Sequence, residues 1–148
     1  MRHIFKKYSN VLPPYCSDSK ILESCNKCLD SPCIGVCEEN IIKKDSNGIY
    51  LDFKESGCSF CKKCAIACME NSFGLLDLTL GDKIVATIQI NQSKCLAWQK
   101  TLCSYCLDVC DNKSIKFIGS LYPEVGESCT KCGMCKSVCP VDAIILKS

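Results

Sequence analysis

The chain has 148 residues, a formal net charge of +2 and 47% hydrophobic residues. The weak charge gives no indication of a nucleic-acid or membrane-surface partner, and no run approaches the roughly 18 apolar residues of a membrane span. Cysteine is the exceptional residue, with 17 copies. An odd cysteine number does not suit a disulfide framework, and no apolar signal segment follows the basic N-terminus. We therefore expect a reduced, cytoplasmic protein whose cysteines bind metal.

Residues 1–24 form a predicted lead-in to the first cysteine motif. The tripeptide Pro13-Pro14-Tyr15 is typical of an extended turn segment. Cys16 lies nine residues before the first motif, and we interpret it as a thiol outside the metal-binding motifs.

Sixteen cysteines then fall into four motifs of four, at residues 25–37, 58–68, 95–110 and 129–139. The last motif has the spacing C-x2-C-x2-C-x3-C-P, which bacterial ferredoxins use to hold [4Fe–4S] clusters. The second has the same spacing without the proline. The predicted ligands are Cys25, Cys28, Cys33, Cys37, Cys58, Cys61, Cys64, Cys68, Cys95, Cys103, Cys106, Cys110, Cys129, Cys132, Cys135 and Cys139.

Two motifs depart from this spacing. The first has two extra residues between Cys28 and Cys33, and the third has a wide gap between Cys95 and Cys103. Three thiolates two residues apart can surround one cluster, and the fourth lies one helical turn further along the same face. A structural zinc site is disfavoured, because zinc usually pairs C-x2-C with a second pair at a distance.

Short apolar segments separate the motifs. The Asn47-Gly48 turn between two such segments predicts a β-hairpin. An apolar residue also recurs five positions after the last cysteine of every motif, and we expect it to pack beneath a cluster. These four residues are Ile42, Phe73, Ile115 and Ile144. Because each repeat is too small to bury a core by itself, the apo-protein should be largely unfolded.

Residues 75–92 lack cysteine and alternate between apolar and polar residues, which predicts a second, connecting β-hairpin. We thus expect an α+β fold in which residues 25–74 and 93–148 are tandem two-cluster ferredoxin-like modules. The gaps between motifs one and two and between motifs three and four are nearly equal, which supports this pairing.

In two-cluster ferredoxins the fourth cysteine ligates the other cluster. Tandem pairing with crossed ligation predicts four ligand sets: Cys25, Cys28, Cys33 and Cys68; Cys58, Cys61, Cys64 and Cys37; Cys95, Cys103, Cys106 and Cys139; and Cys129, Cys132, Cys135 and Cys110. A nested pairing, of motif one with four and two with three, is the open alternative. No acid–base pair, catalytic triad or phosphate-binding loop is evident, so we do not expect an enzyme.

The chain resembles the NapF-type ferredoxin-like proteins encoded with periplasmic nitrate reductases. The resemblance rests on Pro13-Pro14-Tyr15, the 47–50 turn, Cys-Ser-Phe-Cys at 58–61, Cys-Leu-Ala-Trp-Gln at 95–99 and the final Cys-Pro. It implies a cytoplasmic accessory protein with four [4Fe–4S] clusters. It also implies binding to the catalytic subunit of the nitrate reductase before export, to help install or maintain the iron–sulfur centre of that subunit.

Three hypotheses follow. The first is this maturation role, which comes from the resemblance. The second is a soluble polyferredoxin that delivers single electrons to a redox enzyme, which is as much as composition and spacing alone support. The third is a structural zinc protein, which an iron- and sulfide-rich preparation would exclude.

Overall fold

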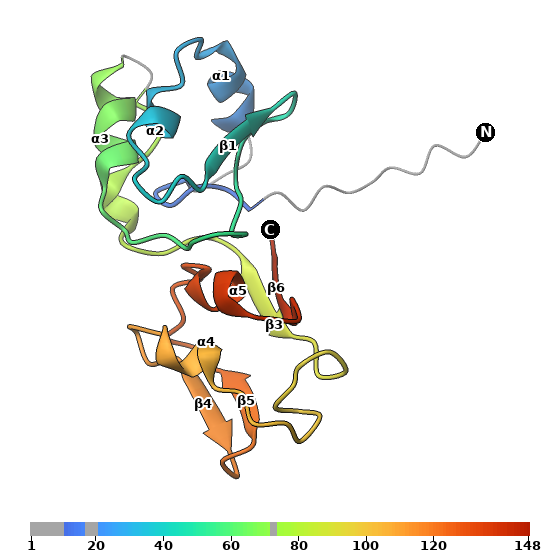
Figure 1. Ribbon diagram of the computed structural model, residues 1–148. Helices are drawn as coiled ribbons and strands as arrows, with labels where there is room; N and C mark the ends of the chain where they lie inside the picture. The colour runs from blue at the N-terminus through green and yellow to red at the C-terminus, as the bar shows by residue number, and fades with distance from the viewer. Residues whose placement is uncertain (1–10, 17–20, 72–73) are drawn as a thin grey trace, which may run out of the picture.

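The computed structural model describes residues 11–16, 21–71 and 74–148. Figure 1 shows two modules of short helices and small strand pairs, which confirms the predicted α+β class. The helices are α1 (Ile21–Lys27), α2 (Pro32–Gly35), α3 (Lys63–Glu70), the 3-10 helix η1 (Leu78–Leu80), α4 (Tyr105–Asp108) and α5 (Met134–Val138). The strands are β1 (Ile42–Asp45), β2 (Gly48–Leu51), β3 (Thr87–Ile90), β4 (Ile115–Ile118), β5 (Tyr122–Val125) and β6 (Ile144–Lys147).

Each cysteine motif ends in a short helix that carries its third cysteine. These cysteines are Cys33 in α2, Cys64 in α3, Cys106 in α4 and Cys135 in α5. The fourth cysteine lies four residues, or about one helical turn, after the third. Within the first module α2 packs on α3, and within the second α4 packs on α5. Motif one therefore lies beside motif two, and motif three beside motif four.

The predicted hairpin around Asn47-Gly48 is confirmed. β1 and β2 pair antiparallel, from Ile42 opposite Leu51 to Asp45 opposite Gly48. The Asp45 carboxylate accepts the Asn47 N–H at 2.8 Å and so closes the two-residue turn. In the second module β4 and β5 form the equivalent hairpin, with Ile115 opposite Val125.

The predicted hairpin over residues 75–92 is wrong. Its first half forms η1, because the Asp77 carboxylate accepts the Thr79 N–H at 2.8 Å and holds a local turn. Its second half forms β3, which pairs with the C-terminal strand β6 instead. The alternating pattern correctly indicated a strand there, but a pattern within one segment does not identify a partner more than fifty residues away.

The apolar position five residues after each motif is buried wherever the structure describes it. Ile42 and Ile144 are each 2% exposed and Ile115 is 3% exposed, so three of the four residues are buried. Their packing beneath a cluster stays a prediction. Phe73 lies outside the described residues. These isoleucines lie in the hydrophobic core of their module, against cysteines of the motifs.

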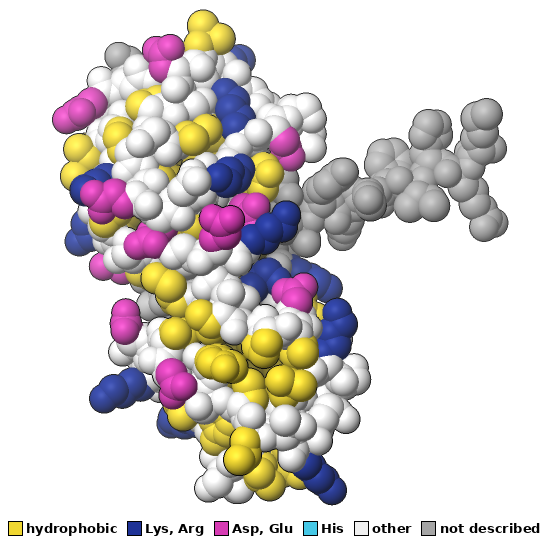
Figure 2. All heavy atoms as spheres, viewed as in Figure 1, with side chains coloured by type: hydrophobic (Ala, Val, Ile, Leu, Met, Phe, Trp, Pro, Cys, Tyr) yellow, Lys and Arg dark blue, Asp and Glu magenta, His cyan; other side chains and the backbone are white. Residues whose placement is uncertain are grey.

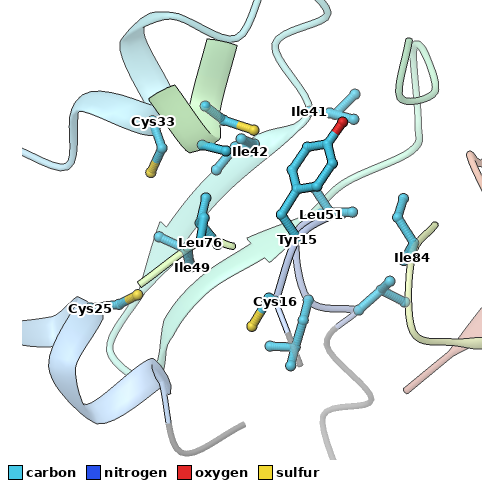
Figure 3. Close-up of a cluster of buried hydrophobic side chains, with 14 of the residues drawn as sticks. Tyr15, Cys16, Cys25, Cys33, Ile41, Ile42, Ile49, Leu51, Leu76 and Ile84 are labelled. Carbon is cyan, nitrogen blue, oxygen red and sulfur yellow. The ribbon is translucent and has the colours of Figure 1, made fainter. Parts of the chain in front are cut away.

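Residues 11–16 belong to the core of the first module, although the sequence indicated only a lead-in. All six are buried, and the carbonyl oxygen of Val11 accepts the Leu51 N–H at 2.9 Å. Figure 3 shows the Tyr15 ring beside Ile41 and Leu51. Its hydroxyl donates to the Asp82 carboxylate at 2.8 Å, so this segment ties β2 to the connector between the modules.

No helix within the described ranges has the length and apolar character needed to cross a membrane.

We expect Ile115→Ala to destabilise the iron-loaded protein by about 2–5 kcal/mol, because it leaves a cavity in the second core. Ile118→Ala is the matched control, because Ile118 lies on the same strand and is 52% exposed. Anaerobic denaturant unfolding, followed by circular dichroism, measures both changes. Equal effects of the two substitutions would contradict the assigned orientation of β4.

Candidate functional site: four sets of cysteines

The structure brings the sixteen motif cysteines together in four sets, here named sites one to four. Three of them line cavities: site one (Cys25, Cys28, Cys33 and Cys68), site two (Cys37, Cys58, Cys61 and Cys64) and site four (Cys110, Cys129, Cys132 and Cys135). At site three, Cys95, Cys103 and Cys139 pack in one apolar cluster, and Cys106 lies close enough to Cys95 and Cys103 to interact electrostatically with them. This grouping has the geometry of the tandem arrangement, in which each fourth cysteine crosses to the neighbouring motif.

The crossing follows from the helix packing. Cys64 lies near the start of α3 and faces site two, whereas Cys68 lies one turn later and faces site one. In the same way, motif one contributes Cys33 to site one and Cys37 to site two. Each pair of adjacent helices therefore serves two sites at once.

Sites two and four share a backbone geometry that directs amide N–H groups at sulfur. Phe60 and Lys62 have φ angles of 52° and 68°, and at the same motif positions Lys131 and Gly133 have 60° and 83°. This left-handed backbone turns the Phe60 N–H toward Cys58 Sγ at 3.4 Å and the Lys131 N–H toward Cys129 Sγ at 3.4 Å. Such donors stabilise negative charge on a thiolate.

A second repeated turn follows the fourth cysteine of three motifs. Asn40, Lys113 and Asp142 each lie three residues after that cysteine, with φ angles of 53°, 49° and 48°. In two cases the next N–H reaches the sulfur: Ser114 N–H donates to Cys110 Sγ at 3.3 Å, and Ala143 N–H donates to Cys139 Sγ at 3.2 Å. Motif two lacks this left-handed turn, because α3 continues past its fourth cysteine to Glu70.

Site one accommodates its two extra loop residues by an outward bulge. Leu29 is 93% exposed, while Ser31 is buried and its hydroxyl donates to the Cys28 carbonyl oxygen at 3.1 Å. The Lys44 ammonium donates to the same oxygen at 2.8 Å and to Ser31 Oγ at 2.9 Å. The Lys44 side chain, which extends from β1, thus holds the loop by two hydrogen bonds.

Asn71 gives site one a side-chain donor. Its Nδ2 lies 3.4 Å from Cys28 Sγ, just after the end of α3. Every other sulfur contact described above comes from a backbone amide. Asn71 is therefore a residue through which a substitution can change one site selectively.

The wide gap in motif three forms a folded loop. Trp98 closes it by donating from Nε1 to the Pro123 carbonyl oxygen at 3.2 Å and by packing on the Tyr122 ring, with centroids 4.7 Å apart. Trp98 is thus a packing residue. Tyr105, in the same motif, is instead 57% exposed beside Cys106.

Burial raises the pKa of several of these thiols and so makes them hard to ionise without a cation. Burial, with a smaller effect of the nearby Cys68, raises the pKa of Cys25 and of Cys33 to about 11. Burial also raises the pKa of Cys58 and of Cys135 to about 12. Cys16, which is 3% exposed, is one of the thiols close enough to Cys25 to contribute to its shift. A bound metal centre would favour the thiolate form at every site.

The sets suit an iron–sulfur cluster better than a single metal ion. Within the described part of the chain, no three cysteine, histidine or acidic side chains lie close enough together to hold one ion. Four thiolates around a cluster of four irons lie farther apart than four thiolates around one zinc, which all bind at about 2.3 Å. The all-sulfur donor sets, the amide donors and the intervening cavities therefore fit a [4Fe–4S] group.

Comparison with known proteins agrees with this chemistry. The family described as 4Fe-4S binding domain matches residues 125–145, which span motif four. The chain is 35% identical to the ferredoxin-type protein NapF of Escherichia coli, over 95% of this chain and 87% of that protein. The chain belongs to the NapF family of ferredoxin-type proteins. It is thus an iron–sulfur protein that carries a 4Fe-4S binding domain.

Two further relatives extend the comparison. The ferredoxin-type protein NapF of Haemophilus influenzae is 32% identical over 95% of this chain and 81% of that protein. The putative electron transport protein YsaA of Escherichia coli is 24% identical over 72% of this chain and 60% of that protein.

We expect Asn71→Leu to lower the reduction potential of site one, because the lost N–H···S hydrogen bond stabilises the more negative, reduced state. A hydrogen-bond difference of about 1 kcal/mol corresponds to roughly 40 mV for one electron. Potentiometric titration followed by electron paramagnetic resonance measures this shift. Asn26→Leu, at an exposed position of α1, is the control. An unchanged potential in Asn71→Leu would contradict the assigned contact.

Proposed function

We propose that this protein is a cytoplasmic accessory protein, not an enzyme, that holds four [4Fe–4S] clusters, one at each of sites one to four. We further propose that it binds the catalytic subunit of a periplasmic nitrate reductase before export and assists the iron–sulfur maturation of that subunit. The observation that carries the proposal is the presence of four complete cysteine sets in a chain of the NapF family.

Four thiolates at each site support an accessory role. When bound, a cluster supplies storage for a single electron and a source of iron and sulfide. The chain's own residues hold the cluster, donate N–H groups to its ligands and limit access of water. Four cysteines complete the coordination, which leaves no position for a substrate, so a catalytic role has no support in these sets.

Partner binding requires an exposed surface, and the second module offers an apolar one beside site three. Leu102 is 95% exposed and directly precedes Cys103. A groove there is lined by Tyr105, Leu107, Phe117 and Leu121. Figure 2 shows hydrophobic side chains gathered on the face of this module. We propose that the catalytic subunit contacts the chain here, which would bring it next to one of the cysteine sets.

Iron transfer tests the maturation role directly. The protein is loaded anaerobically with labelled iron, mixed with catalytic subunit that lacks its cluster, and separated from it. We expect both label and nitrate reductase activity in the catalytic subunit. If no label moves but the subunit becomes reduced, the protein is an electron carrier, the alternative that the match to a putative electron transport protein favours.

We expect Leu102→Ser to weaken the complex with the catalytic subunit by about tenfold, because an exposed apolar anchor contributes on the order of 1–2 kcal/mol at an interface. Leu29→Ser is the matched control, because Leu29 is 93% exposed and follows Cys28 in the first module. Calorimetric titration of each variant compares the affinities. A loss confined to Leu29→Ser would place the partner on the first module instead.

A further inference from the structure

The two modules touch through residues that belong to the cysteine sets themselves. The N–H of Cys58 in site two donates to the carbonyl oxygen of Cys132 in site four at 2.7 Å. Ser59 and Phe60 also line the cavity of site four, beside Cys129 and Cys132. The backbone of site two therefore contacts the backbone of site four directly.

Two glycines permit this approach. A Cβ atom on Gly57 would lie 2.4 Å from Met134 N and 2.7 Å from the Cys132 carbonyl oxygen, both of which are backbone atoms. A Cβ atom on Gly133 would lie 2.2 Å from Cδ1 of Phe53, a residue that is only 3% exposed. A second backbone bond, from the Ile84 N–H to the Thr130 carbonyl oxygen at 3.0 Å, holds the same edges together. We name residues 57–58 and 132–134 the junction.

The chain order of the sites differs from their spatial order. Sites one and two share α2 and α3, and sites three and four share α4 and α5. The junction joins sites two and four. In space the sequence of sites is therefore one, two, four, three, with sites one and three at the ends.

We propose that the junction couples the two modules electronically, so that an electron passes between sites two and four by way of the Cys58–Cys132 hydrogen bond. This inference rests on the proposed occupancy of the four sites. The transfer oxidises one site by one electron and reduces the other by one electron, with no bond made or broken and no proton taken up. A one-electron reductant supplies the electron at one end, and a one-electron acceptor removes it at the other.

The matched variants are Gly57→Ala and Gly35→Ala. The first inserts a methyl group into the junction, whereas a Cβ on Gly35 meets no atom within 4 Å. Iron and sulfide are counted in each variant first, because this measurement alone tests the occupancy. Dithionite then reduces each protein by one electron per chain. The hyperfine-shifted β-proton resonances of Cys58 and Cys132 are recorded at several protein concentrations, which separates exchange within a chain from exchange between chains.

If exchange is confined to each module, chains reduced in the first module and chains reduced in the second give separate β-proton resonances, beside those of the oxidised and doubly reduced chains. Exchange across the junction averages the resonances of these two kinds of singly reduced chain to one. We expect one averaged resonance in the wild type and in Gly35→Ala, and a loss of averaging in Gly57→Ala. Two resonances in the wild type, or identical spectra in all three proteins, would overturn the inference.

An iron and sulfide content in the wild type below that needed to fill four sites would overturn the proposed occupancy and, with it, the inference. Full iron with unaveraged resonances would overturn the inference alone. Should Gly57→Ala fail to take up iron, Phe53→Leu replaces it, because it removes ring atoms that lie next to Gly133 without adding any to the junction. We expect the β-proton resonances of Cys58 and Cys132 to lose their averaging in Phe53→Leu as well. Unchanged averaging in that variant would contradict the role of the junction.

Discussion

The grouping of cysteine side chains in sets of four is the constraint on which this structure depends. Thiols that share a small apolar space repel each other as thiolates and lose solvation, as the raised pKa values of Cys58 and Cys135 show. The short helices and two-stranded sheets around them bury only small hydrophobic cores, which include several of the cysteines themselves. A cationic iron centre resolves both problems at once, because it stabilises the thiolates and fills the space between the elements. Folding and cluster binding are therefore expected to be one process.

The same constraint explains how the backbone is built. Left-handed residues recur before and after the cysteines because they turn amide N–H groups toward sulfur. The isoleucines that follow motifs one, three and four are buried in the cores. Where the chain must pass close to a neighbouring motif, at Gly57 and Gly133, no side chain fits. The contact at Gly57 and Cys58 is thus a backbone contact between two cysteine loops.

Local features were predictable from the sequence, and long-range ones were not. The Asn47-Gly48 hairpin and the buried Ile42, Ile115 and Ile144 follow from turn chemistry and from the position after each motif. The structure also groups the cysteines in the four sets that the spacing indicated, and their ligation of iron stays a prediction. The pairing of β3 with β6 could not be predicted, because alternation within one strand carries no information about its partner.

The packing of residues 11–16 was missed for a similar reason. Two prolines and a tyrosine are typical of an exposed turn, and only the position of Asp82 and β2 makes this segment part of the core. Asn71 was missed as well, because its contact with Cys28 depends on where α3 ends. A polar residue close to the end of a cysteine helix is the signal that could have identified it.

The most direct test of the account is the location of iron in crystals grown anaerobically, by anomalous scattering at the iron absorption edge. The account predicts four separate groups of iron, each beside one of the four cysteine sets, with Cys37 bound to the group of Cys58 and Cys139 bound to the group of Cys95. A group shared by Cys37 and Cys139, or a single metal ion within any set, would contradict it.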